Sequence, residues 1–128
     1  IAYTDHQLGR LFEGLRARGV LERALVVVTS DHGETFAEHT QCFSHGESVY
    51  DSEARTPLIV AFPRGERAGT RVATQVSAVD VLPGMLEALA LSAPKGVEGR
   101  SFLDALHTGT KPRGVVFCEA TKPGGVPR

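Results

Sequence analysis

Two short apolar runs stand out along the chain, and both predict strands of a folded core. Residues 25–29 read Leu-Val-Val-Val-Thr, a β-branched run typical of a strand that is covered on both faces. Residues 58–62 read Leu-Ile-Val-Ala-Phe and lie between Pro57 and Pro63, which suit the ends of strands better than their middles. Weaker strands are expected at residues 72–76 and 115–118.

Two further stretches have the period of amphipathic helices. The first carries apolar residues at i, i+3, i+4 and i+7, and Gly19 suits its end. The second follows Asp80, which we expect to cap its N-terminus. A short helix is expected at residues 101–106. The apolar positions are Leu8, Leu11, Phe12 and Leu15 in the first helix and Leu82, Met85, Leu86 and Leu89 in the second.

A helix, a short link and a buried strand, in this order, form half of a crossover unit. We therefore expect an α/β fold with a mostly parallel sheet and flanking helices. The 128 residues are 41% hydrophobic and 23% charged, which is the length and composition of one globular domain. Fibrous, disordered and membrane classes do not fit this composition.

Charge and cysteine content narrow the range of partners. The formal net charge of -1 offers no electrostatic basis for binding nucleic acid or an anionic membrane, so we expect neither partner. No apolar run approaches the roughly 18 residues of a membrane span. The two cysteines, Cys42 and Cys118, lack the spacing of a metal site and are expected to be ordinary thiols, with a single disulfide as the alternative.

Candidate chemistry follows the first predicted strand. Asp31 and His32 come where this strand ends, directly before Gly33, and strand ends of open α/β sheets are where ligands bind. A carboxylate beside an imidazole suits zinc, manganese or a mixed metal site. The alternative is a simple turn in which Asp31 caps the backbone and His32 is solvated.

The polar stretch at residues 34–53 reads as a functional loop, because it is long and lies beside a strand end. It carries His39 and His45, either of which the loop can fold back toward His32, although no metal-binding spacing requires it. A divalent cation takes four or more ligands, so the remaining ligands of such a site are expected on polypeptide outside this chain.

The same region resembles the sulfatase branch of the alkaline phosphatase superfamily. The similarity covers most of the chain in the family's order and spacing. The matching segments are Asp5-His6-Gln7-Leu8-Gly9, Thr29-Ser30-Asp31-His32-Gly33-Glu34, Glu38-His39, His45-Gly46, Tyr50, Arg55-Thr56-Pro57-Leu58-Ile59, Val79-Asp80-Val81-Leu82-Pro83 and Gly99-Arg100-Ser101-Phe102.

The resemblance implies a metal-dependent hydrolase of sulfuric esters. It implies that Asp31 and His32 bind one divalent metal ion, calcium first, with manganese or zinc as alternatives. It also implies a catalytic role for His45, at a family position whose Lys or His contacts the sulfuryl or phosphoryl oxygens. His39 is expected either to support the site or to have a structural role, and not to bind the metal. Many sulfatases have Asn where this chain has His32, and a phosphodiesterase or phosphonate monoester hydrolase is the alternative reaction.

The resemblance also bears on the extent of the chain. The family's nucleophile segment, Cys or Ser-x-Pro-x-Arg, and its paired aspartates are not in this sequence. We expect residues 1–128 to be a single domain or fragment, the C-terminal portion of a sulfatase-like catalytic domain, inactive without the N-terminal part that is its partner. The expected substrate is a sulfate or phosphate ester, and the family implies a periplasmic, secreted or lysosomal location. A non-catalytic α/β module that binds an anion or a partner is the alternative class.

Overall fold

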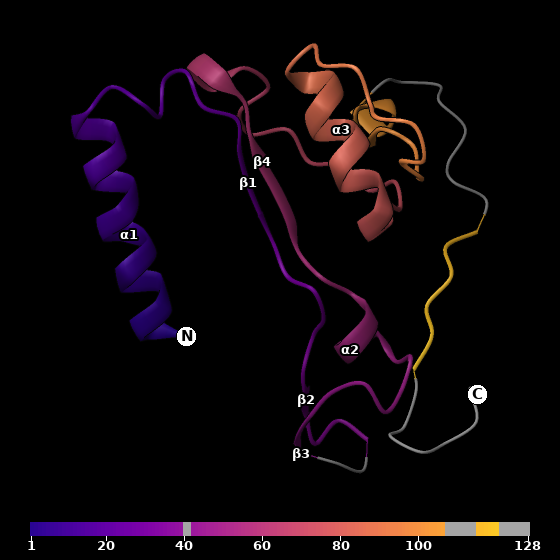
Figure 1. Cartoon of the computed structure of the whole chain (residues 1–128). Helices are drawn as coiled ribbons and strands as arrows, with labels where there is room; N and C mark the ends of the chain where they lie inside the picture. Colours follow the sequence, from indigo (N-terminus) through magenta and orange to yellow (C-terminus); the bar gives the residue numbers. More distant parts are fainter. Residues whose placement is uncertain (40–41, 107–114, 121–128) are drawn as a thin grey trace.

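The computed structural model describes residues 1–39, 42–106 and 115–120, which form helices and short strands (Figure 1). The elements are α1 (Ala2–Ala17), β1 (Val26–Thr29), β2 (Thr35–Phe36), β3 (Cys42–Ser44), α2 (Asp51–Ala54), β4 (Leu58–Ala61) and α3 (Val81–Ala88), with 3₁₀ turns η1 (Pro63–Gly65), η2 (Ala78–Asp80) and η3 (Phe102–Leu106). The α/β class expected from the sequence is confirmed.

The first helix ends where the sequence predicts. Gly19 adopts φ +64°, and its N–H donates to the carbonyl of Arg16 at 2.9 Å. The N–H of Val20 donates to the carbonyl of Leu15 at 3.0 Å, which completes a Schellman motif. Glycine suits this position because it adopts a positive φ without steric cost.

Strands β1 and β4 are confirmed, but their pairing differs from the expected parallel sheet. They run antiparallel, with Val26 opposite Ala61 and Thr29 opposite Leu58. The chain between them forms the antiparallel β2–β3 pair and the one-turn helix α2, with no long crossover helix to return it to its starting end. Neither strand is covered on both faces, since no residue of β1 is buried and Ile59 of β4 is 62% exposed.

Helix α1 lies beside this sheet without closing on it (Figure 1). A groove of about 420 Å³ separates them, and Leu8, Phe12, Val26 and Ile59 contribute to its apolar lining. None of the residues of α1 is buried, and Leu8 remains 38% exposed. The periodicity therefore identified the apolar face of this helix, but that face is only partly covered.

The best-buried hydrophobic side chain in the described part of the chain is Phe102, at 6% exposure, on η3. Its ring lies directly against Gly84 of α3, where an added Cβ would come within 2.1 Å of the Cδ1 atom. This contact confirms that residues 101–106 form a short helical element, and it shows that the element packs on α3.

Asp80 is buried and occupies the N-cap position of α3 as expected, but its side chain has a different role. Its carboxylate makes no capping hydrogen bond to α3. One oxygen accepts the N–H of Ser77 at 2.9 Å, and the other accepts the N–H of Arg100 at 2.8 Å. Asp80 therefore connects the residues before α3 to the loop before η3. Its buried carboxylate needs hydrogen-bond donors, and these two backbone N–H groups provide them.

The two weaker strand predictions are wrong. Residues 72–76 and 115–118 form no strand in the described part of the chain. An alternating pattern does not make a strand unless a neighbour supplies the ladder hydrogen bonds. Among the described residues no helix combines the length and the apolar character needed to cross a membrane.

Candidate active site

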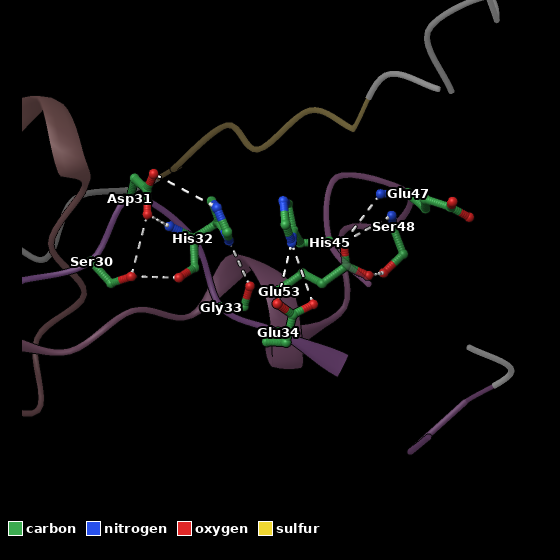
Figure 2. Close-up of polar contacts among 9 residues, drawn as sticks. All are labelled: Ser30, Asp31, His32, Gly33, Glu34, His45, Glu47, Ser48 and Glu53. Atoms are coloured by element: carbon green, nitrogen blue, oxygen red, sulfur yellow. Dashed lines mark hydrogen bonds and ion pairs between the residues drawn. The ribbon is translucent and has the colours of Figure 1, made fainter. Parts of the chain in front are cut away.

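Asp31 and His32 lie directly beyond the end of β1, in the segment that leads to β2 in Figure 1, and His45 directly follows β3. The hydroxyl of Thr29, the last residue of β1, donates to the carbonyl of Pro57 at 2.8 Å, immediately before β4. The chain then leaves the strand through Ser30 and presents Asp31 and His32 (Figure 2). The pairing of β1 with β4 thus holds the start of this segment in place.

Asp31 uses one carboxylate oxygen locally and turns the other toward His32. Its Oδ1 accepts the N–H of His32 at 3.0 Å and the hydroxyl of Ser30 at 3.5 Å. Its Oδ2 lies 3.7 Å from the His32 Nε2 atom. The hydrogen bond from the His32 N–H lowers the pKa of Asp31, and the nearby imidazole lowers it further. The side chain is 87% exposed, so an ionised oxygen is accessible to a cation.

The ring of His32 is oriented by a backbone acceptor. Its Nδ1 donates to the carbonyl of Gly33 at 2.8 Å, and because a carbonyl only accepts, this nitrogen carries a proton. In the neutral imidazole the lone pair is then on Nε2, the atom that faces Asp31. The Gly33 carbonyl is the main cause that raises the pKa of His32, and the carboxylates of Asp31, Glu34 and Glu53 add to it against partial desolvation.

The two donors fit part of a metal site. Atoms bound at about 2.0–2.5 Å to one cation lie roughly 3–4 Å apart, and the Oδ2–Nε2 distance of 3.7 Å falls in this range. A histidine whose other nitrogen donates to a carbonyl is the usual arrangement of a metal ligand. The described residues contain no group of three or more His, Cys, Asp and Glu side chains that could hold a metal ion. Of the ligands that a divalent cation needs, Asp31 and His32 could supply two.

His45 comes to the same place from a different part of the chain. Its ring stacks on that of His32, with 4.0 Å between centroids and 20° between planes. Its Nδ1 lies 3.3 Å and 3.4 Å from the two carboxylate oxygens of Glu34, which orient the ring. The loop after β1 does fold back toward His32, as one of the sequence alternatives proposed, and it is His45 that it delivers.

His39 does not join this group in the structure. Its ring stacks on Tyr50, with 3.6 Å between centroids and 25° between planes. Tyr50 precedes α2, so this contact packs the loop against the helix that follows it. The expectation that His39 supports the site and does not bind metal remains a prediction.

Three residues of the site were not singled out from the sequence. Glu34 orients the ring of His45. Gly33 and Glu53 connect the segment after β1 to α2, because the Gly33 N–H donates to the Glu53 carbonyl at 2.7 Å. A Cβ at Gly33 would lie 2.0 Å from the carbonyl oxygen of Ser52. In the sequence only their positions marked these residues: Gly33 and Glu34 follow Asp31 in the motif, and Glu53 lies in the polar stretch at residues 34–53.

The chain is similar to known proteins over most of its length. The family model named Sulfatase matches residues 1–91. Arylsulfatase K from Bos taurus is 37% identical over 102 residues, which cover 80% of this chain and 18% of that protein. The uncharacterized sulfatase YidJ from Escherichia coli strain K12 is 36% identical over 114 residues, covering 89% of this chain and 21% of that protein. The chain thus spans about a fifth of the length of these curated relatives.

A solved structure shares the fold. BT4656, in complex with its substrate D-glucosamine-2-N,6-O-disulfate, matches with a TM-score of 0.61 and 27% sequence identity. The match covers 91% of this chain and 23% of that protein. It confirms the partial sulfatase-type α/β fold that the motifs predicted.

Proposed function

The chain belongs to the sulfatase family, and from this premise we propose that the full-length protein that contains it is a metal-dependent sulfuric ester hydrolase. In this proposal residues 1–128 are the C-terminal portion of the catalytic domain. They supply the metal ligands Asp31 and His32 and the anion-contacting residue His45. The nucleophile and the remaining ligands come from a segment outside residues 1–128, so this portion is inactive alone.

The observation that carries the proposal is the convergence of Asp31, His32 and His45. An ionised carboxylate and an imidazole nitrogen face each other at 3.7 Å, and a second imidazole stacks on the first. Each imidazole has its Nδ1 held by an acceptor. A turn made only of solvated residues would not require any of these contacts.

A divalent ion held by Asp31 and His32 would draw electron density from the ester oxygens and stabilise an anionic nucleophile. We propose calcium as the ion because the chain belongs to the sulfatase family and Asp31 offers a hard oxygen, with manganese and zinc as alternatives because His32 offers a nitrogen donor. Neither ligand needs to change its hydrogen bonds for this role. The Oδ1 of Asp31 and the Nδ1 of His32 already have partners, which leaves Oδ2 and Nε2 for a cation.

His45 would act at the leaving group. Hydrolysis of a sulfate ester breaks the bond between sulfur and the ester oxygen, and the departing oxygen must gain a proton. An imidazole whose Nδ1 is held by Glu34 can present its Nε2 to that oxygen, either as an acid or as a cation that offsets the negative charge. The ring is half exposed, so an ester that enters the site can reach it.

The substrate class is a sulfate ester. The bound substrate of the similar BT4656 structure is a sulfated glucosamine, which supports an ester of this kind for the present protein. One observation favours a second candidate. His32 gives a nitrogen donor where many sulfatases have Asn, and a nitrogen donor suits the manganese or zinc of phosphodiesterases and phosphonate monoester hydrolases.

Purified full-length protein tests these alternatives directly. We expect turnover of an aryl sulfate above that of aryl phosphate mono- and diesters, and elemental analysis should find one divalent ion. Asp31→Asn and His32→Ala should each lose both the metal and the activity, whereas the control His6→Ala, which changes an exposed residue of α1, should keep both. The hydrolase proposal would be overturned if the full-length protein retained no divalent ion, or if both site variants turned over the ester at the wild-type rate. Metal binding without turnover of any ester would favour a non-catalytic module.

A further inference from the structure

A buried carboxylate lies between the two halves of the site. Glu53, on the one-turn helix α2, is 5% exposed, although acidic side chains are seldom buried to this extent. It has no place in the proposed reaction, because it neither binds the metal nor faces the ester. Its burial therefore needs another explanation.

The carboxylate of Glu53 holds the loop that follows His45. Its Oε2 accepts the backbone N–H of Glu47 at 3.2 Å and that of Ser48 at 3.3 Å, and its Oε1 accepts the hydroxyl of Ser48 (Figure 2). These donors come two and three residues after His45, beyond Gly46, whose φ of +76° turns the chain. Three hydrogen bonds thus close this loop around one carboxylate.

The backbone of Glu53 holds the other half of the site. Its carbonyl accepts the N–H of Gly33 at 2.7 Å, and Gly33 is the residue whose own carbonyl orients the ring of His32. The approach is so close that only glycine fits at position 33. One residue is therefore bonded to both segments, the one that carries His32 and the one that carries His45.

We infer that Glu53 is a positioning residue that keeps the ring of His45 stacked on the ring of His32. Its catalytic consequence rests on the proposed sulfatase function, whereas its effect on the loop at residues 46–48 does not. The physical basis is that removing the carboxylate leaves three donors without their acceptor, which favours rearrangement of the loop. Outer partners of this kind typically change activity or metal affinity by roughly 10–100-fold when they are removed.

The test compares Glu53→Gln and Glu53→Ala with Asp51→Asn in the full-length protein. Asp51 lies on the same helix and its side chain is exposed, so Asp51→Asn removes the same charge without touching the loop. The measurements are kcat, KM, bound metal, and hydrogen exchange of the peptide that covers residues 46–48. Ser48→Ala removes one of the three donors and serves as a graded variant.

We expect Glu53→Gln to lower kcat by roughly 10–100-fold while the metal content stays at the wild-type level, and to speed exchange at residues 46–48. Both effects should be larger in Glu53→Ala than in Glu53→Gln and smaller in Ser48→Ala. Asp51→Asn should have the wild-type kcat and the wild-type exchange at residues 46–48. Wild-type kcat and exchange in Glu53→Gln would overturn the inference, as would faster exchange across the whole chain with loss of metal. If the wild-type protein hydrolyses no ester, exchange at residues 46–48 alone decides the inference.

Discussion

The imidazoles of His32 and His45 stack with 4.0 Å between their centroids, although thirteen residues separate them in the sequence. Each ring has its Nδ1 held by an acceptor, the Gly33 carbonyl at 2.8 Å or the Glu34 carboxylate at 3.3 Å. In Figure 2 the second nitrogen of each ring lies on the opposite side from these acceptors. The pair can therefore present one nitrogen to a cation and the other to a leaving group.

His45 should matter most for esters with poor leaving groups. Replacing it with Gln removes the acid, which should lower kcat by about 10²–10⁴-fold for an alkyl sulfate. The fall should be smaller for a nitroaryl sulfate, whose leaving oxygen needs little protonation. The measurement is kcat for both esters, with His6→Gln as control because His6 is an exposed residue of α1. An equal fall for both esters would contradict the acid role.

Asp31 should couple metal binding to stability. A ligand present at 100 times its dissociation constant adds about 2.7 kcal/mol to the free energy of unfolding when it binds only the folded state. We expect this gain in the wild-type protein on addition of the bound metal and its loss on treatment with a chelator. Asp31→Asn should show little gain, while Asp5→Asn, which changes an exposed acid of α1, should keep it. Urea unfolding with and without metal measures the difference, and an unchanged gain in Asp31→Asn would exclude this residue as a ligand.

Gly33 should not tolerate a side chain. A Cβ at this position would lie 2.0 Å from the Ser52 carbonyl oxygen, so Gly33→Ala forces the two backbones apart and should destabilise the fold by about 1–3 kcal/mol. Gly9→Ala in α1 is the matched control, since nothing lies within 4 Å of an added Cβ there. It should stabilise the protein by about 0.5–1 kcal/mol, because alanine favours a helix interior. Denaturant titration of both variants checks the opposite signs.

Phe102 should contribute more to stability than any exposed aromatic residue. Its ring packs on Gly84 and is 6% exposed, so Phe102→Ala should cost about 3–5 kcal/mol. Phe117 is 91% exposed, and Phe117→Ala should stay within about 0.5 kcal/mol of wild type. Thermal and chemical unfolding measure both values. Similar losses for the two variants would mean that the contact between α3 and η3 is not a core.

Glu53 should make stability depend on pH. Its pKa lies below the ordinary 4.5, chiefly because the Ser48 hydroxyl donates to it and then because the backbone N–H groups of Ser48 and Glu47 do, which together outweigh desolvation. A group whose pKa is lowered on folding stabilises the protein above its unfolded pKa and loses that contribution as the pH falls through its folded pKa. The stability gap between wild type and Glu53→Gln should therefore be constant near neutral pH and narrow below pH 4.5. Urea unfolding across this range checks it, and a gap that widens on acidification would refute the assignment.

Local sequence was enough for α1, α3, β1 and β4, but not for β2, β3 and α2, which lie in the stretch at residues 34–53 that was predicted to be a loop. The apolar period of α1 and α3 and the β-branched runs of β1 and β4 each depend on neighbours within one turn or one strand. The same reasoning failed at residues 72–76 and 115–118, where a strand pattern has no partner in the described chain. It also failed for the direction of the β1–β4 pair. It placed Asp80 correctly at the N-cap of α3 but missed the hydrogen bond from Arg100, twenty residues away, to the Asp80 side chain.

The same distinction between local sequence and long-range contacts applies to the candidate site. Asp31 and His32 could be chosen from the sequence because they are neighbours at a strand end, and the family motifs added His45. Nothing in the order of residues indicated that His45 stacks on His32, that Glu34 orients it, or that Glu53 joins the two segments. Those relations are contacts between groups distant along the chain, and they form only when the β2–β3 pair and α2 bring the loop back toward the end of β1.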